Sequence, residues 1–226
     1  MPIALTRATL RFDLPAMTLA ALLLFLLALD GKLSTLDGLI LLFGGAVYTT
    51  LLVRAARRES DDRTNVAATA RGQQRSWLQM VRLLVGLVVV VVGAELLVEG
   101  AVRAARSLSL SETVIGLTVV AIGTSAPELV TTVVSTVRGD RELALGNLLG
   151  SSIYNIGAVL GLTVLVASPG LPVPDDVLAA DLVLLVAAAV AAVPVFLTGA
   201  RISRLEGALL VATYVGYLTW LLVART

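Results

Sequence analysis

Long uncharged apolar runs alternate with short polar segments along most of the 226-residue chain. The longest uncharged runs cover residues 143–174, 182–200 and 207–224. A helix that crosses a bilayer needs about 20 mostly apolar residues, so these runs are long enough for membrane spans. The pattern predicts an all-α integral membrane protein with about seven spans, at residues 14–29, 36–53, 78–102, 112–137, 142–166, 177–197 and 205–223.

Two of the predicted spans carry polar residues where a lipid-facing helix tolerates few. The span at 112–137 contains GTSAPE, from Gly123 to Glu128, and the span at 142–166 contains GNLLGSSIYN, from Gly146 to Asn155. Polar and ionisable side chains are expensive inside a membrane, so they usually mark a substrate or ion path. The stretch 116–161 is therefore the candidate functional site.

The first polar segment predicts a broken helix. Ser125 and Glu128 are three residues apart and share one helical face. Pro127 cannot donate a backbone hydrogen bond and clashes with the carbonyl four residues earlier, which should free carbonyls near Ala121 and Gly123. Freed carbonyls at membrane depth need a partner such as a cation or water.

The second polar segment is expected to repeat this arrangement, with Gly146, Asn147 and Gly150 loosening the helix. Two broken helices could then present one cage of oxygen ligands, from Ala121, Thr124, Ser125, Glu128, Ser151 and Asn155. Ca²⁺ takes six to eight oxygens at roughly 2.3–2.6 Å, and Na⁺ accepts similar ligands. One carboxylate cannot neutralise Ca²⁺, so a second carboxylate from elsewhere is expected.

Simpler interpretations exist for several of these residues. A span rich in glycine, serine and threonine is often only a close helix-packing surface, although that leaves Glu128 unexplained. Asn147 could cap a half-helix, and Tyr154 is assigned to packing. Glu95 and Glu99 are placed near the outer end of the third span, with a role in an ion path as the alternative.

Composition excludes several kinds of chemistry. The chain contains no cysteine and no histidine, which removes thiolate and imidazole ligands and histidine acid–base catalysis. A hydrolase built on Ser125 or Ser151 would lack a general base. We therefore expect no enzyme activity, no cofactor and no nucleic-acid partner, and any bound metal must be a hard cation held by oxygen.

The charged residues predict a topology. Residues 54–76 form a polar linker of mixed charge, which separates residues 1–53 from residues 77–226. With this linker and the N-terminus in the cytoplasm and the C-terminus outside, the basic residues obey the positive-inside rule. The only Lys and Arg residues left outside are Lys32, Arg103, Arg106 and Arg225.

An internal repeat relates residues 1–53 to the end of the chain. Asp13 aligns with Asp181, Gly31 with Gly199 and, after one inserted residue, Gly38 with Gly207. The matched spans run in opposite directions through the membrane, as in many secondary transporters with inverted repeats. Residues 1–53 then hold the last two helices of a first repeat, and residues 77–226 hold a complete five-helix second repeat.

The sequence GTSAPEL followed by GNLLGSSIYNIG resembles the α-repeat signature of the sodium/calcium exchanger family, within the cation/Ca²⁺ antiporter superfamily. Bacterial and archaeal members look most similar, although the family usually has Asn at Ser152 and Leu at Ala126. The resemblance covers the last seven of ten helices in a fold of two inverted five-helix repeats, so the first α-repeat is missing. It implies that Ca²⁺ and Na⁺ are coordinated by Glu128, Thr124, Ser125, Ser151, Asn155 and the Ala121 carbonyl.

These observations lead to one main hypothesis and two alternatives. The main hypothesis is a secondary antiporter in a bacterial or archaeal plasma membrane, which exchanges Ca²⁺ for Na⁺ and is a truncated or half-transporter. The first alternative replaces Na⁺ by H⁺ as the counter-ion. The second is a half-subunit that transports nothing until a second chain or copy supplies the first α-repeat.

Overall fold

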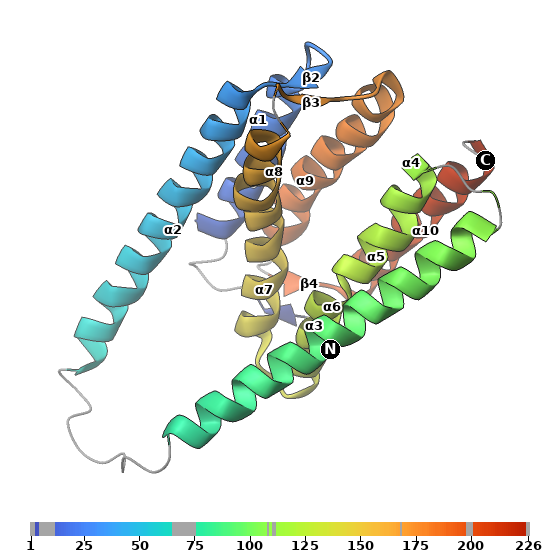
Figure 1. Cartoon of the computed structure of the whole chain (residues 1–226). Helices are drawn as coiled ribbons and strands as arrows, with labels where there is room; N and C mark the ends of the chain where they lie inside the picture. The colour runs from blue at the N-terminus through green and yellow to red at the C-terminus, as the bar shows by residue number, and fades with distance from the viewer. Residues whose placement is uncertain are drawn as a thin grey trace. The chain divides into compact units, whose positions relative to one another are not determined.

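A computed structural model describes residues 3–4, 12–64, 76–107, 109, 112–167, 169–197 and 201–224, and most of these are helical (Figure 1). In the described part of the chain, the stretches labelled η2, η3 and η4 are π-helices, and short strands of two residues pair into small ladders. Cα packing divides the chain into two units, Met1–Ala68 with Gly139–Ile202 and Thr69–Arg138 with Ser203–Thr226. The positions of these units relative to one another are not determined, so each is described by itself.

The first unit holds four helical spans and both ladders. Its helices are α1 (Leu14–Leu27), α2 (Thr35–Thr64), α7 (Arg141–Tyr154), η3 (Asn155–Leu160), α8 (Gly161–Val166), η4 (Val177–Asp181) and α9 (Leu182–Leu197). Its strands are β1 (Ile3–Ala4), β2 (Lys32–Leu33), β3 (Leu171–Pro172) and β4 (Arg201–Ile202).

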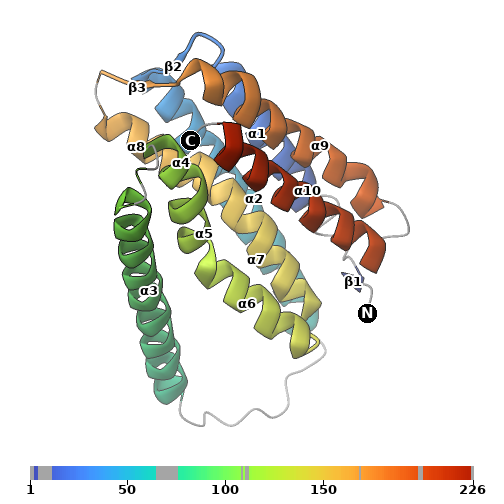
Figure 2. The same cartoon turned by 90° about the vertical axis from the view of Figure 1, so that its right-hand side faces the viewer.

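The second unit holds the long helix α3 (Ser76–Ser107), which packs along a chain of shorter helices (Figure 2). These are α4 (Glu112–Ile115), η2 (Gly116–Val120), α5 (Ala121–Thr124) and α6 (Ala126–Val137). The last helix, α10 (Arg204–Ala224), also belongs to this unit.

Helices occur at all seven positions predicted for membrane spans, which confirms the all-α class. Among the described residues, four spans are long and apolar enough to cross a membrane, and a fifth joins them if the bent pair Gly116–Thr124 and Ala126–Val137 is one span. The four are Thr35–Ala55, Glu142–Val166, Val177–Leu197 and Arg204–Ala224. The count of seven spans stays a prediction.

The predicted second span, 36–53, agrees with the apolar segment Thr35–Ala55, but its helix is longer than the apolar run. The linker was expected to begin at residue 54, yet α2 continues to Thr64. Residues 54–64 contain Ala, Arg and Glu residues of high helix propensity and no Gly or Pro, so nothing in the sequence stops the helix where the apolar run ends. Hydropathy marks the membrane boundary, whereas propensity decides where the helix stops.

Close backbone contacts between glycines hold α2 against η3 and α8. A Cβ on Gly157 would lie 3.0 Å from the Gly45 Cα, and a Cβ on Gly38 would lie 3.0 Å from the Gly161 carbonyl oxygen. Such small residues let helices approach closely in a membrane, where apolar burial alone drives little association. The buried cluster beside this contact contains Leu24, Ala28, Leu33, Leu41 and Val164.

Helices α1 and α9 pack side by side in Figures 1 and 2. Leu14 and Phe196 are buried there with Leu145 and Leu149 of α7. The Thr18 hydroxyl donates to the Leu14 carbonyl at 3.0 Å and to the Ala189 carbonyl at 3.4 Å, so it bonds across the helix pair. These contacts place α7, which leads into Asn155, against the α1–α9 pair.

The two strand ladders follow the repeat seen in the sequence. In one ladder Lys32 pairs with Pro172 and Leu33 with Leu171, and in the other Ala4 pairs with Arg201 and Ile3 with Ile202. Each ladder therefore joins a strand that belongs to residues 1–53 with a strand that belongs to the second repeat. The alignment that matches Asp13 with Asp181 also matches β1 with β3, which supports the inverted relation.

Matching capping boxes begin α2 and α10. The Ser34 N–H donates to Asp37 Oδ2 at 2.7 Å, and the Ser203 N–H donates to Glu206 Oε2 at 2.7 Å. In return, each serine hydroxyl accepts the N–H of its acidic partner, at 3.4 Å and 3.2 Å. This reciprocal pattern satisfies N–H groups that have no acceptor inside the helix, and it occurs at equivalent positions of the two repeats.

The glycine contact predicts a sharp difference between two substitutions on one span. Gly157→Val places new atoms against the α2 backbone, so we expect it to lower the free energy of unfolding by about 1–3 kcal/mol. Gly146→Val is the control, because a Cβ there meets nothing within 4 Å. Thermal unfolding of the purified protein in detergent measures both, and equal melting temperatures would contradict the proposed packing.

Candidate functional site

The first polar segment forms the expected break. Helices α5 and α6 meet at Ser125 with a bend of 46°, and Pro127 lies in the first turn of α6. The Thr124 hydroxyl donates to the Val120 carbonyl at 2.9 Å and to the Ala121 carbonyl at 3.2 Å. The Ala121 carbonyl also accepts the Ser125 N–H at 3.2 Å, so it is not freed as predicted. Pro127 supplies no N–H to the carbonyl four residues earlier, at Gly123.

Gly123 fixes how α3 lies beside this bend. The residue is buried, and a Cβ at this position would overlap the Val98 Cγ2 atom of α3. Just before the bend, over Gly116–Val120, the helix η2 has π-helical hydrogen bonds, which join residues five apart instead of four. Such π-helical turns are frequent at functional sites, because they displace backbone and side chains from regular positions.

Glu128 lies in the first turn of α6, one helical turn after Ser125. Its side chain is partly buried, and its Oε2 atom is shielded from solvent. The N-terminal end of a helix favours a negative charge, because the backbone N–H groups there point toward it. The carboxylate therefore lies within about one helical turn along the chain from Thr124 and Ser125, and this set of oxygen-bearing residues suits a hard cation.

The second polar segment differs from the prediction. Helix α7 is continuous through Gly146, Asn147 and Gly150, and its N-cap is Asp140, whose Oδ1 accepts the Leu143 N–H at 3.2 Å. The α-helix instead gives way to a π-helix at Asn155. Isolated glycines lower helix stability by only about 1 kcal/mol each, which packing readily overcomes. The predicted location of this break and the capping role of Asn147 were therefore wrong.

The junction of α7 and η3 carries both predicted ligands of the second segment. Ser151 is partly buried there, and Asn155 is exposed. The Ser151 hydroxyl donates to the Leu148 carbonyl at 3.2 Å, and the neighbouring Ser152 hydroxyl donates to the same carbonyl at 3.0 Å. The hydroxyl oxygens keep lone pairs for a further partner. This segment can thus offer one amide and two hydroxyl oxygens.

The two groups of predicted ligands lie in different units. Ala121, Thr124, Ser125 and Glu128 belong to the second unit, and Ser151 and Asn155 belong to the first. Their convergence on one ion therefore stays a prediction. Within the described residues, no group of three or more carboxylates forms a ready metal site. A cation would rely on a mixture of one carboxylate, amide, hydroxyl and carbonyl oxygens.

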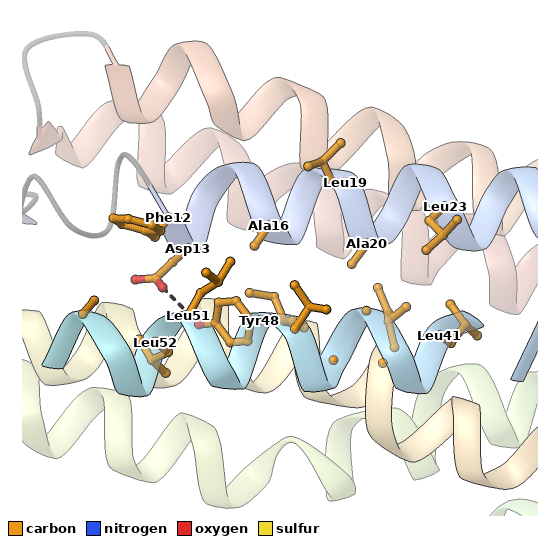
Figure 3. Close-up of a pocket in the computed structure, with 17 residues that line it drawn as sticks. Phe12, Asp13, Ala16, Leu19, Ala20, Leu23, Leu41, Tyr48, Leu51 and Leu52 are labelled. Atoms are coloured by element: carbon orange, nitrogen blue, oxygen red, sulfur yellow. Dashed lines mark hydrogen bonds between the residues drawn. The ribbon is translucent and has the colours of Figure 1, made fainter. Parts of the chain in front are cut away.

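A polar cluster beside Asn155 was missed at the sequence level. The Tyr48 hydroxyl donates to Asp13 Oδ1 at 3.0 Å (Figure 3). The Tyr48 and Tyr154 rings meet edge to face, with their centroids 5.9 Å apart. The Tyr154 hydroxyl lies 3.1 Å from Thr49 Oγ1. The signal was present, since Asp13 aligns with Asp181 and Tyr48 aligns with Tyr217 once the inserted residue is counted.

A cavity of about 330 Å³ lies in the first unit, between α1, α2 and the α7–η3 segment (Figure 3). Asp13 and Tyr48 are its polar residues, and they are bonded to each other. The remaining lining is apolar, including Leu19, Leu41 and Ile156. A lining of this kind cannot replace the hydration shell of a cation, so the cavity is distinct from the candidate ion site.

The alternative role of Glu99 in an ion path finds no support. Its carboxylate pairs with Arg103 one turn later on α3, and both side chains are exposed. Glu95 is exposed on the same helix. Exposed pairs of this type contribute little free energy, so Glu99 is best explained as a surface residue at its end of α3.

The contact at Gly123 predicts that two substitutions compensate each other. Gly123→Ala should push α3 away from the bend and lower the melting temperature, because its Cβ overlaps Val98. Adding Val98→Ala removes the overlapping methyl groups and should recover most of the loss. Thermal unfolding of both single variants and the double variant gives the coupling, and strictly additive effects would contradict the contact.

Comparison with known proteins identifies the family. The sodium/calcium exchanger protein family matches residues 78–223. The putative antiporter CaxA of Alkalimonas amylolytica is 35% identical over 224 residues, which cover 96% of this chain and 69% of CaxA. The inner membrane protein YrbG of Escherichia coli (strain K12) is 33% identical, and the match covers 75% of this chain and 53% of YrbG.

Solved structures agree with these sequence matches. The sodium–calcium exchanger NCX_Mj, from crystals soaked with zero Na⁺ and Ca²⁺, superimposes with a TM-score of 0.74 at 28% sequence identity. The superposition covers 96% of this chain and 67% of that protein. This chain thus corresponds to only part of each of these relatives, and it belongs to the sodium/calcium exchanger protein family.

Proposed function

We propose that this chain carries one half of the ion site of an antiporter that exchanges Ca²⁺ for Na⁺. The observation that carries the proposal is the bend between α5 and α6, where Glu128 follows Thr124 and Ser125 at the start of a helix. A carboxylate within about one helical turn of two hydroxyl-bearing residues, in a predicted membrane span, suits a hard cation. Membership of an exchanger family supports the same function.

Exchange follows from competition for the same oxygens. Ca²⁺ and Na⁺ both prefer carboxylate, hydroxyl and carbonyl ligands, so binding of one ion displaces the other. In the proposed site Glu128 supplies the charge, while Thr124, Ser125, Ser151, Asn155 and the Ala121 carbonyl supply neutral ligands. Rocking of one group of helices against another would expose the bound ion to each side of the membrane in turn.

One carboxylate is too few for a Ca²⁺ site in a membrane. A divalent cation beside a single Glu128 leaves one uncompensated positive charge, which is costly at low dielectric. The inverted repeat suggests the source of a second carboxylate, namely a first α-repeat supplied by another chain or copy. CaxA and NCX_Mj each extend beyond the region that this chain matches, which supports the proposal.

Charge placement supports an orientation in the membrane. In the proposed arrangement the N-terminus and the segment between α2 and α3 lie in the cytoplasm of a prokaryotic cell, and the C-terminus lies outside. Arg54, Arg57, Arg138 and Arg204 then fall on the cytoplasmic side, as the positive-inside rule requires.

Substitution of Glu128 should abolish Ca²⁺ binding. Glu128→Gln keeps the shape of the side chain but removes its charge, so we expect Ca²⁺ affinity to fall about 100-fold or more, equivalent to ~3 kcal/mol. Asn155→Ala removes a neutral ligand and should cost about tenfold. Isothermal titration with the active assembly measures both, and Glu99→Gln, on the exposed face of α3, is the control with unchanged affinity.

Retained Ca²⁺ affinity in Glu128→Gln would remove this carboxylate from the site. If Asn155→Ala and Glu99→Gln gave the same small loss, Asn155 would have no ligand role. Measuring Na⁺ competition on the same samples shows whether both cations use one set of oxygens.

Vesicle transport tests the coupling ion and the need for a partner. The chain alone should give little or no Ca²⁺ flux, because it lacks the second carboxylate. With a partner that supplies the first α-repeat, an imposed Na⁺ gradient should drive Ca²⁺ movement and a proton gradient alone should not. Robust Ca²⁺ flux from the chain alone would contradict the proposed half-site. Ca²⁺ flux that does not change with the Na⁺ gradient but depends on the proton gradient would favour Ca²⁺/H⁺ exchange.

A further inference from the structure

The junction between α7 and η3 has a change of helix type at the residue predicted to bind an ion. At Asn155 the α-helix gives way to a π-helix, and the Asn155 N–H is shared between the carbonyls of Ser151 and Ser152. A π-helical turn holds more residues than an α-helical turn, so side chains after the junction are rotated relative to those before it. The direction in which Asn155 points therefore depends on what packs against the junction.

Helix α2 packs against the chain just after Asn155. A Cβ on Gly157 would lie 3.0 Å from the Gly45 Cα and 3.4 Å from the Leu41 carbonyl oxygen. This contact sets the distance between η3 and α2, because small residues let two membrane helices approach closely. Two glycines have no side chains to interlock, so their contact alone does not fix how η3 is rotated about its own axis.

Tyr154 supplies a second contact with α2, just before Asn155. Its hydroxyl lies 3.1 Å from Thr49 Oγ1, and the Thr49 hydroxyl donates to the Gly45 carbonyl at 2.8 Å. A threonine hydroxyl has one hydrogen, so with that hydrogen directed to Gly45 the Tyr154 hydroxyl is the donor to Thr49. Tyr154 and Gly157 are thus both linked to Gly45, one through Thr49 and the other by direct backbone contact.

Tyr48 of α2 supports the ring of Tyr154. The two rings meet edge to face, with their centroids 5.9 Å apart and their planes inclined by 72°. Aromatic rings prefer this arrangement, so it favours one orientation of the Tyr154 ring. The bond from the Tyr48 hydroxyl to Asp13 Oδ1 anchors Tyr48 in turn to the start of α1, where Asp13 is only 9% exposed (Figure 3).

The Asn155 side chain has no such anchor in the part of the chain that the structure describes. None of those residues forms a hydrogen bond with its amide group, which is exposed. The amide oxygen therefore keeps its lone pairs for a cation. What the fold holds in place is the backbone on either side of Asn155, through Tyr154 and Gly157.

We propose that Tyr154 is a positioning residue for Asn155, held by Thr49 and Tyr48 of α2. Together with the Gly157 contact, it fixes the rotation of the junction and so the direction of the Asn155 amide. All of these residues belong to the first unit. This role rests on the proposed function, in which Asn155 is an ion ligand, and it gives Tyr154 more than the packing role expected from the sequence.

Hydrogen exchange on the full chain, without Ca²⁺ or Na⁺, tests the positioning. Tyr154→Phe keeps the ring and removes the donor, and Thr49→Val removes the acceptor at similar side-chain size. We expect each to raise amide exchange at residues 155–160 about fivefold, the factor that corresponds to one neutral hydrogen bond, and the double variant to raise it no further. Thr50→Val is the matched control with unchanged exchange, because the Thr50 hydroxyl makes the same kind of bond, to the Ala46 carbonyl at 2.8 Å.

Ion affinity shows whether the effect acts through Asn155. In the active assembly, Tyr154→Phe should lower Ca²⁺ affinity about threefold, since a ligand held less firmly loses part of its contribution. In the Asn155→Ala background the same substitution should lower the affinity no further, because the residue that it positions is gone. A residue that only stabilises the fold would give equal losses in both backgrounds.

Several outcomes would overturn the positioning role. These are equal losses of Ca²⁺ affinity in the two backgrounds, unchanged exchange at residues 155–160 in Tyr154→Phe, and a rise in exchange with Thr50→Val as large as that with Thr49→Val. Unchanged Ca²⁺ affinity in both Glu128→Gln and Asn155→Ala would overturn the proposed function, and the positioning role with it. Lower affinity in those two variants with no effect of Tyr154→Phe would overturn the positioning role alone.

Discussion

Close contact between glycine backbones is the interaction on which the first unit depends. In a membrane, lipid tails are as apolar as leucine, so helices associate through van der Waals contact and hydrogen bonds rather than through burial from water. Gly157 of η3 lies so close to α2 that a Cβ there would be 3.0 Å from the Gly45 Cα, and Gly38 and Gly161 make a similarly close contact further along the same helix pair. Because η3 begins at Asn155, the same contact fixes the backbone that carries one predicted ligand.

The internal repeat is visible in the turns as well as in the helices. Two ladders join strands of opposite repeats in matching register, and matching capping boxes start α2 and α10. These short elements satisfy backbone groups at the turns, where the chain leaves one helix and enters the next.

The sequence alone was enough to predict features that follow from one kind of residue. Apolar runs predicted the helical positions, and Pro127 predicted the bend, because proline must remove a hydrogen bond wherever it falls inside a helix. Sequence reasoning was wrong about helix breaks and helix ends that depend on packing or on helix propensity. The glycines at 146 and 150 stay helical, the break comes at Asn155, and α2 continues past its apolar run to Thr64. The repeat alignment marks Asp13 and Tyr48 as positions that recur, but the two residues are 35 positions apart, so the bond between them is seen only in the fold.

In the proposed assembly, charge balance links the ion site to both repeats. Glu128 contributes one carboxylate at the N-terminal end of α6. One such charge balances one Na⁺, whereas an inverted pair balances one Ca²⁺ or two Na⁺ ions. In the proposed assembly, Ca²⁺ can therefore leave at low cost only when other positive charge takes its place, because two unpaired carboxylates at close range repel each other. Coupling then requires both repeats, and the mixed neutral ligands contributed by each repeat serve mainly to fit the ion's size.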